Sequence, residues 1–397
     1  MGANRDHGLG PESNLTDTND YLAPEQRARI DIDEQLVECG WVIQDYKHAA
    51  IAAARGVAVR EVPTEAGPAD YVLFVDRQAV GVVEAKKVGT TLTGVEWQTH
   101  KYQSNFPDEL PAFTVDGYLP FGYESTGTET RFTSGLEPEP TSRRVFTFHR
   151  PETFARWVDD YIDLASISNL RGGIHLLPEL DPTGLWPAQE VAIRNLEKSM
   201  KENRPRALIQ MATGSGKTFT AANISYRLLR HAGAQRILFL VDRGNLGKQT
   251  IKEFQGFDAP DDGRKFTELY NARRLSDSHL DMADEAGTKV HVSTIQRVYS
   301  ILRGEPIDDD LDEQSGSDIA PSRPVEIEYN PKVPIESYDV IIIDECHRSI
   351  YGVWRQVLEY FDAFLVGLTA TPGKQTFGFF DQNLVCLLYT SPSPRDS

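Results

Sequence analysis

The pattern of apolar and polar positions divides the chain into two unlike parts. From Leu185 onward, short apolar runs alternate with helical segments such as Phe219–His231. The apolar runs are Ala207–Gln210, Ile237–Val241, Val290–Ser293, Val340–Ile343 and Ala363–Leu368. Continuous apolar strands that alternate with helices predict a parallel sheet with helices on both faces.

The front part of the chain gives shorter and more mixed signals. They predict a helix from Pro24 to about Gly40, strands at Tyr71–Val75 and Val80–Ala85 around a polar turn, a loop or irregular hairpin at 125–142, and a helix at Phe154–Leu164. The apolar stripe of the first helix is predicted at Ile30, Leu36 and Val37.

These signals predict five segments. They are a disordered N-terminus at 1–22, an α/β domain at 23–164, a linker at 165–184, a parallel-sheet domain at 185–385 and a tail at 386–397. An acidic insert at 304–335 interrupts the second domain. Residues 304–320 are expected to form no packed structure, because seven acids and no base lie between Glu305 and Asp318.

Composition indicates a soluble, cytoplasmic protein without a membrane partner. The 397 residues are 40% hydrophobic, enough for two or three domain cores. No apolar run reaches the roughly 18 residues of a membrane span, and the N-terminus does not resemble a secretory signal. Cys39, Cys346 and Cys386 are far apart, which argues against a disulfide framework and against a zinc site.

Net charge limits how the chain could bind nucleic acid. The formal net charge is −18, and residues 1–40 and 301–336 together carry −13 of it. The remainder is not basic, so no long-range steering field follows from the composition. DNA binding must therefore depend on local groups or on other parts of an assembly.

Residues Ala212–Thr218 match a phosphate-binding loop both in residue types and in their position between predicted elements. The segment follows an apolar strand and precedes a helix. Backbone N–H groups of Thr213, Gly214, Ser215 and Gly216 would converge on phosphate oxygens. Lys217 would reach the outer phosphates of ATP, and the Thr218 hydroxyl would bind Mg²⁺. The alternative is a glycine-rich turn with an incidental lysine.

A second motif supports the nucleotide site. The apolar strand at 340–343 ends in Asp344 and Glu345, and carboxylates at this edge of a parallel sheet lie beside a phosphate-binding loop. Asp344 would hold Mg²⁺, and Glu345 would orient and activate the attacking water. A solvated turn would explain the two charges but not their pairing with the loop.

These motifs, with Thr369-Ala-Thr371 after a further buried strand, resemble those of superfamily-two helicases and translocases, which have a RecA-like lobe. The resemblance implies that Gln189 reads adenine, and that His347, Thr369 and Thr371 couple hydrolysis to movement. It also implies DNA-tracking roles for Leu240–Arg243 with Gln249 and for Ser293–Gln296. Gln189 could instead be a surface glutamine at a helix start.

The front domain carries a second candidate site. Asp70 is followed by Glu84-Ala-Lys86, and Glu84 and Lys86 share one face of a strand. A hairpin centred on Arg77 would set Asp70 opposite Glu84, about 5 Å away and within reach of one divalent cation. Mg²⁺ there could polarise a phosphodiester, with Lys86 stabilising the developing charge.

These residues resemble the PD-(D/E)xK nucleases, which have a restriction-endonuclease-like α/β fold. Gln98 and Tyr102, four residues apart on a predicted helix, resemble the supporting QxxxY element of that fold. Glu25 either adds to the site or is a helix N-terminal carboxylate. The alternative for the whole group is a salt-bridged surface hairpin.

Together the two sites resemble the restriction and motor subunit of type I restriction enzymes, from about Arg27 to Val385. The resemblance implies an ATP- and Mg²⁺-dependent translocase and endonuclease that cleaves unmodified double-stranded DNA. Its implied partners are methylation and specificity subunits, and we find no target-reading module. The alternatives are a repair or type III-like helicase with a non-catalytic front domain, and a nucleotide-binding chain without turnover.

The chain departs from this family at its end. Family members continue into a second RecA-like lobe that carries an arginine finger. We therefore expect this chain to bind ATP but to hydrolyse it slowly. Residues 386–397 resemble translated non-native sequence.

Overall fold

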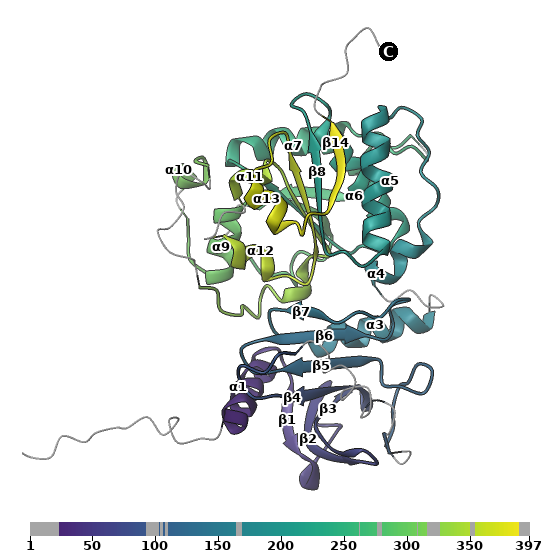
Figure 1. Cartoon of the computed structure of the whole chain (residues 1–397), viewed down its shortest axis with the longest axis vertical. Helices are drawn as coiled ribbons and strands as arrows, with labels where there is room; N and C mark the ends of the chain where they lie inside the picture. The colour runs from purple at the N-terminus through teal and green to yellow at the C-terminus, as the bar shows by residue number, and fades with distance from the viewer. Residues whose placement is uncertain are drawn as a thin grey trace, which may run out of the picture.

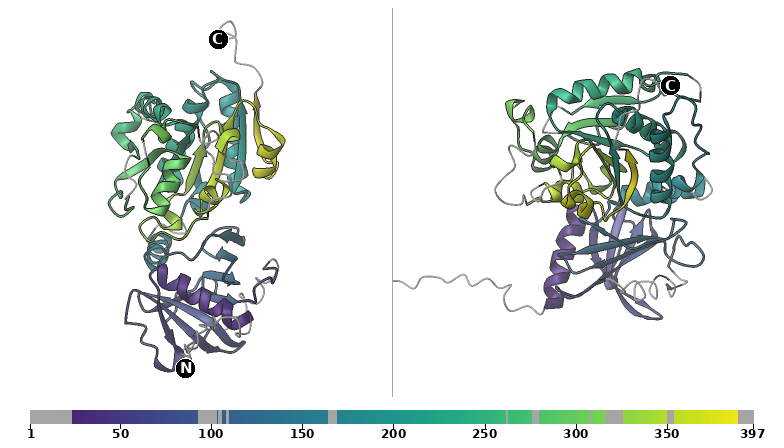
Figure 2. Two further views of the ribbon diagram at one scale, coloured as in Figure 1. Left: turned by 90° about the vertical axis from the view of Figure 1, so that its left-hand side faces the viewer. Right: turned by 45° about the horizontal axis from the view of Figure 1, so that its top comes forward.

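The structure is a computed structural model that describes residues 24–92, 103, 106–107, 110–163, 169–261, 263–275, 280–307, 309–315, 326–349 and 354–388. Two seven-stranded sheets follow one another along the chain. Figure 1 shows them as two domains stacked along the longest axis of the molecule, and the turned views of Figure 2 show the same arrangement. No helix among these residues is long and apolar enough to cross a membrane.

The first domain is built on a mixed sheet whose strands follow chain order. Its elements are α1 (Pro24–Glu38), β1 (Val42–Asp45), β2 (Gly56–Thr64), β3 (Gly67–Val75), β4 (Gln78–Ala85), β5 (Phe121–Ser125), β6 (Thr130–Ser134), β7 (Arg143–Val145) and α3 (Pro151–Asp163). The pairs β1–β2 and β4–β5 are parallel, and the other neighbours are antiparallel. The two predicted strands are confirmed as parts of β3 and β4, and β6 lies where a loop or irregular hairpin was expected.

The apolar stripe predicted for α1 is confirmed at Leu36 and is wrong at Ile30 and Val37. Ile30 and Val37 are 37% and 57% exposed, whereas Ala28, Ile32 and Leu36 are fully buried. These three residues are spaced by four and therefore share one helical face. The small side chain of Ala28 gives a weak apolar signal in the sequence.

The second domain is built on a parallel sheet, as predicted, with strand order β10-β11-β9-β12-β13-β8-β14. Its elements are α4 (Leu170–Gly173), α5 (Pro187–Lys201), β8 (Arg206–Met211), α6 (Lys217–His231), β9 (Ile237–Val241), α7 (Gly244–Gly256), α8 (Phe266–Leu269), β10 (Asn271–Arg274), β11 (Thr288–Thr294), α9 (Ile295–Arg303), α10 (Asp309–Asp312), β12 (Val340–Ile343), α11 (Cys346–Ser349), α12 (Arg355–Glu359), β13 (Phe364–Thr369), α13 (Lys374–Phe379) and β14 (Leu384–Leu388). All five predicted strands are confirmed.

Alternation along the parallel strands fills a core on each face of the sheet. Val340 and Ile342 pack with residues of α5, α6 and α7, whereas Ile341 and Ile343 belong to a second cluster with residues of α9 and α12. This second cluster is continuous with the core of the first domain. The two sheets therefore share one body of buried apolar side chains.

The structure differs from three of the predictions about segments of the chain. In the predicted linker 165–184, Leu170, Ile174, Leu177 and Leu180 are buried in the core of the second domain, so this stretch is not a free connection. The expectation that 304–320 stays unpacked is wrong for its described part, because Asp312 is 1% exposed and Ser315 is fully buried. The tail boundary at residue 386 falls inside β14, which pairs with β8. Residues 1–22 and 389–397 lie outside the described range.

Two buried acids of the second domain join it to the first. Arg143 on β7 binds Asp362 through two hydrogen bonds of 2.8 and 2.9 Å, and His149 Nε2 lies 3.0 Å from the same carboxylate. Arg150 Nε and Thr153 Oγ1 both donate to Glu336, at 3.0 and 2.7 Å. These polar contacts fix the orientation of one domain against the other.

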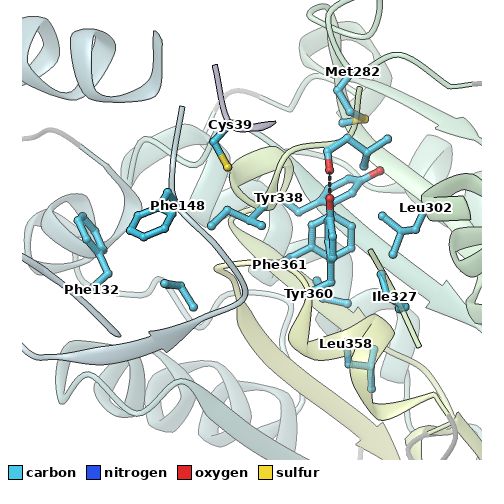
Figure 3. Packing of buried hydrophobic residues seen from close by; sticks show 14 of the residues in the cluster. Cys39, Phe132, Phe148, Met282, Leu302, Ile327, Tyr338, Leu358, Tyr360 and Phe361 are labelled. Atoms are coloured by element: carbon cyan, nitrogen blue, oxygen red, sulfur yellow. Dashed lines mark hydrogen bonds between the residues drawn. The ribbon is translucent and has the colours of Figure 1, made fainter. Parts of the chain in front are cut away.

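Apolar packing surrounds these contacts. Figure 3 shows Cys39, Phe132 and Phe148 of the first domain beside Tyr338, Tyr360 and Phe361 of the second. The Phe146 and Tyr360 rings lie 4.8 Å apart between centroids. Because the side chains of Arg143 and Asp362 are only 13% and 7% exposed, solvent screens their ion pair weakly.

Asp362 should be a large contributor to stability. Burial opposes its ionisation, but Arg143, with His149 and Arg171, outweighs burial and holds the pKa of Asp362 well below its ordinary value. Asp362→Ala leaves buried cationic groups without a counter-charge, and we expect a loss of about 3–5 kcal/mol in the free energy of unfolding. Urea titration at pH 7 measures this loss.

A depressed carboxyl pKa stabilises the fold above its unfolded value and loses that effect as pH falls through the folded value. The gap between wild type and variant should therefore shrink only below about pH 3.9. Asp258→Ala is the control, since Asp258 pairs with Lys265 at 2.6 Å but is 61% exposed. Equal effects of the two substitutions would contradict a special role for Asp362.

Candidate nucleotide and nuclease sites

The phosphate-binding loop lies between β8 and α6, as the sequence predicts. Gly214 and Gly216 have φ angles of +78° and +82°, which favour glycine. The Ser215 hydroxyl donates to the carbonyl of Ala212 at 2.6 Å and stabilises the turn. Thr213 is exposed, and Lys217 and Thr218 begin α6. The loop thus presents backbone N–H groups at a helix N-terminus, the arrangement that binds phosphate.

Gln189 is a buried partner of this loop rather than a surface residue. It is 4% exposed at the start of α5, where its Oε1 accepts from the backbone N–H of Trp186 at 3.0 Å. Its Nε2 donates to the carbonyl of Ser215 at 3.3 Å. A Cβ at Gly216 would lie 2.4 Å from that same Nε2. Glycine at 216 is therefore needed both for the backbone angle and for the approach of Gln189.

The two carboxylates after β12 face the loop. Lys217 Nζ lies 2.5 Å from Glu345 Oε1, so the ammonium group that would bind phosphate is held by this carboxylate. Glu345 has a φ of +46°, an uncommon angle that is often found at functional sites. Burial, together with the charge of Glu345, raises the pKa of Asp344 to about 6, and Lys217 opposes the shift.

The residues expected to couple hydrolysis to movement form one hydrogen-bonded chain. His347 Nδ1 lies 2.9 Å from Thr369 Oγ1, which accepts from the backbone N–H of Thr371 at 3.2 Å. Partial burial lowers the pKa of His347. The neutral imidazole therefore joins the loop after β12 to the loop after β13.

In the first domain, Asp70 lies beside Glu84 for a reason the sequence did not show. The turn between β3 and β4 pairs Val75 with Gln78, one residue out of the predicted hairpin centre at Arg77. A register shift between Leu73 and Phe74 then sets Tyr71 opposite Val83. The β-bulge thus restores the register that the hairpin arithmetic required.

Hydrogen bonds draw the predicted nuclease residues together. The Ala85 backbone N–H donates to Asp70 Oδ2 at 2.8 Å, and Lys86 Nζ donates to Glu84 Oε1 at 2.8 Å. Burial raises the pKa of Glu84, with the charge of Asp70 adding to the shift and Lys86 opposing it. The group is therefore a real cluster of charges at the end of two paired strands.

Arg29 of α1 is a member of this group that sequence reasoning missed. Its guanidinium binds Asp70 through Nη2 and Glu61 through Nη1, the latter at 3.0 Å. Glu25, one turn earlier, pairs with Lys87 at 3.8 Å, and both side chains are more than half exposed. Glu25 thus does not join the cluster. No strand pattern could have indicated Arg29, because the contact comes from helix-on-sheet packing across 41 residues.

The donor set fits Mg²⁺ better than a metal bound only by protein ligands. Within the described ranges, no group of three or more His, Cys, Asp or Glu residues could hold a metal. Mg²⁺ commonly takes one or two carboxylates and completes its shell with water and substrate phosphate. Asp70 with Glu84, and Thr218 with Asp344, fit that pattern. Gln98 and Tyr102 lie outside the described residues.

A cavity of about 760 Å³ lies between the domains, away from both sites. Its charged lining residues are Arg131, Arg143, Arg144, Arg171, Arg206, Glu326, Arg355, Glu359, Asp362 and Asp381. Most of these arginines are paired with acids, including Arg206 with Glu359 at 2.6 Å. The cavity therefore belongs to the domain interface and not to either site.

Comparison with known proteins gives matches to two separate stretches of the chain. Residues 183–374 match the family "Type III restriction enzyme, res subunit", and residues 44–116 match the second domain of the type I restriction enzyme EcoKI endonuclease subunit. The chain is 27% identical to the EcoKI endonuclease subunit of Escherichia coli K12 over 90% of its length. The chain is thus similar to type I restriction endonuclease subunits over most of its length.

Two further proteins match different shares of the chain. The EcoAI endonuclease subunit of E. coli is 34% identical over 47% of the chain and 19% of its own length. A solved fragment assigned to the HsdR subunit of a type I restriction enzyme from Vibrio vulnificus covers 90% of this chain and 57% of its own length, with 21% identity and a TM-score of 0.33. The chain spans 33% of the EcoKI subunit.

Gly216→Ala should damage the phosphate-binding loop. The left-handed angle adds roughly 1 kcal/mol of strain, and the new Cβ must displace Gln189. We expect a lower melting temperature and a smaller thermal shift on addition of a non-hydrolysable ATP analogue. Gly378→Ala is the control, because no atom lies within 4 Å of its Cβ position. Identical behaviour of the two variants would show that the loop tolerates a side chain at 216.

Proposed function

We propose that this chain carries the nuclease domain and the first ATP-binding lobe of a type I restriction endonuclease subunit, which moves along double-stranded DNA and cleaves it when unmodified. The most direct support is that the two domains carry two distinct groups of residues suited to binding phosphate. The Lys217 site suits a nucleotide, and the Asp70 site suits a phosphodiester. A matching family at each end of the chain supports the same assignment.

In the nucleotide site, each residue has a separate task. The loop from Thr213 to Gly216 binds phosphate oxygens through backbone N–H groups, and Lys217 exchanges the Glu345 carboxylate for the outer phosphates. Glu345, once released from Lys217, orients the attacking water. Thr218 and Asp344 would hold Mg²⁺.

In the nuclease site, Asp70 and Glu84 would hold Mg²⁺, and Lys86 places its ammonium group beside the scissile phosphate. Bound Mg²⁺ supplies charge neutralisation and an activated water in such sites. Arg29 orients the Asp70 carboxylate while no cation is bound.

The partners we propose are double-stranded DNA and the methylation and specificity subunits of a restriction complex. We propose the cytoplasm as the place of action. The buried free thiols of Cys39, Cys346 and Cys386 suit a reducing compartment.

Two substitutions should affect ATP binding and ATP turnover differently. Lys217→Ala removes a charged contact to phosphate worth about 1.5–3 kcal/mol, so affinity for fluorescent ATP should fall about 10- to 100-fold. Glu345→Gln removes the carboxylate that competes for Lys217, so binding should remain and turnover should fall. Equilibrium titration and phosphate release measure the two effects. Unchanged affinity in Lys217→Ala would refute the nucleotide site.

Nuclease activity should depend on the charges of the Asp70 group. Asp70→Asn should reduce Mg²⁺-dependent cleavage of supercoiled plasmid roughly 100-fold or more, because several kcal/mol of charge stabilisation is lost. Glu61→Gln is a matched control, since Glu61 also binds Arg29 but stands outside the cluster. If Asp70→Asn cleaves normally, the front domain is a DNA clamp, as in the repair-helicase alternative.

A further inference from the structure

The described part of the acidic insert, residues 309–315, docks on the second domain through one buried carboxylate. Asp312 Oδ1 accepts a hydrogen bond from Thr294 Oγ1. Asp312 Oδ2 accepts from Arg274 Nη2 at 2.9 Å and from Arg297 Nη2 at 3.2 Å. Asp312 is 1% exposed, whereas the neighbouring Leu311 is 42% exposed. Gln296 Nε2 also donates to the Gln314 carbonyl at 2.9 Å, so polar contacts, with Asp312 carrying the charge, hold the segment.

Two helix N-termini meet at this carboxylate. Thr294 is the N-cap of α9, and its side chain accepts from the backbone N–H of Arg297. Gly244 begins α7, and a Cβ there would lie 3.0 Å from Asp312 Oδ2. Helix N-termini favour anions, and only a residue without a side chain lets the anion come this close to α7. Two guanidinium groups, a hydroxyl and two helix ends together form a built anion site.

The Asp312 carboxylate stands in this site where a phosphate group would fit. Phosphate takes the same donors as a carboxylate, with more oxygens and more charge. The site lies at the carboxyl ends of β9 and β11, the sheet edge at which open α/β sheets bind ligands and at which the Lys217 loop also lies.

The same segment is connected to the nucleotide site. The Ser315 hydroxyl donates to Asp242 Oδ1 at 2.6 Å, and Arg348 Nη1 donates to Asp242 Oδ2 at 3.1 Å. Arg348 lies on α11, three residues after Glu345. Loss of the segment from its site would therefore remove one of the groups that hold Asp242 against α11.

We propose that Thr294, Arg297 and Arg274 form a binding site for a backbone phosphate of DNA, and that Asp312 occupies it as an internal competitor. DNA must displace the segment to engage this part of the second domain, and its affinity is lower by the cost of that exchange. The inference rests on the proposed DNA-binding function and adds an autoinhibitory contact to it.

The direct test neutralises the competitor. Asp312→Asn keeps the shape of the side chain and removes its charge. We expect it to bind a short fluorescent duplex on the order of tenfold more tightly than wild type, the usual size of such a coupling. The logarithmic salt dependence of binding should steepen by about one phosphate contact. Asp310→Asn, an exposed change in the same segment, should leave affinity unchanged.

A second measurement follows the segment itself. Amide exchange of peptides covering 309–315 should rise when saturating duplex is added to wild type. If Asp312→Asn is folded by thermal melting yet binds DNA no tighter than Asp310→Asn, and exchange does not rise, Asp312 is a structural ion pair and the proposal is wrong.

Inorganic tripolyphosphate separates this inference from the proposed function. It should stabilise Asp312→Asn against heat more than wild type or Asp310→Asn, while the Lys217 loop contributes equally to all three. If no variant binds DNA but this difference appears, the anion site stands and the DNA function fails. If DNA binds and the difference is absent, the anion site fails alone.

Discussion

Two buried carboxylates, those of Glu336 and Asp362, fix how the two domains lie against each other, and Asp362 has the most charged partners. Asp362 receives Arg143 through two parallel hydrogen bonds and His149 through one, and Arg171 lies 3.7 Å away. A buried ion pair adds little net stability compared with a well-packed apolar contact, because both charges lose water. Its value is geometric, since a planar guanidinium accepts a carboxylate in only one orientation. The relative positions of the Lys217 and Asp70 sites depend on that orientation.

An uncommon backbone angle and a close ion pair occur together in the nucleotide site. Glu345 takes a left-handed angle, and its carboxylate neutralises Lys217 at 2.5 Å while Asp344 stays buried beside it. Without Lys217, two carboxylates would face each other in a poorly solvated place. The site is therefore complete only with a cation, and bound phosphate must compete with Glu345. The hydrogen bond between His347 and Thr369 connects this site to the end of β13.

Local patterns predicted much of the fold, and long-range contacts did not. Five strands of the second sheet were predictable because each is a short apolar run buried in the sheet, whereas β10, with the sequence Asn-Ala-Arg-Arg, and β14 at the two edges were not predicted. The pairing of Asp70 with Glu84 was predicted from a hairpin centre that is one residue off, and a bulge corrected the error. The periodicity of apolar residues in the sequence does not predict a β-bulge of this kind. The contacts of Arg29 with Asp70 and of Arg143 with Asp362 also lie outside any local pattern, since 41 and 219 residues separate the partners.

The acidic composition has a different meaning once Asp312 is placed. A net charge of −18 argues against DNA binding if all the acids repel phosphate from a distance. The described part of the insert instead brings one of its carboxylates to two arginines and two helix N-termini. Positive potential in this domain is therefore local, formed by helix ends and buried guanidinium groups rather than by a basic surface. The net charge does not reveal this positive potential, because helix ends carry no formal charge. In addition, an acid of the same chain covers the arginines. Composition could not reveal such a site, and its description as an unpacked acidic insert followed from counting charges without their partners.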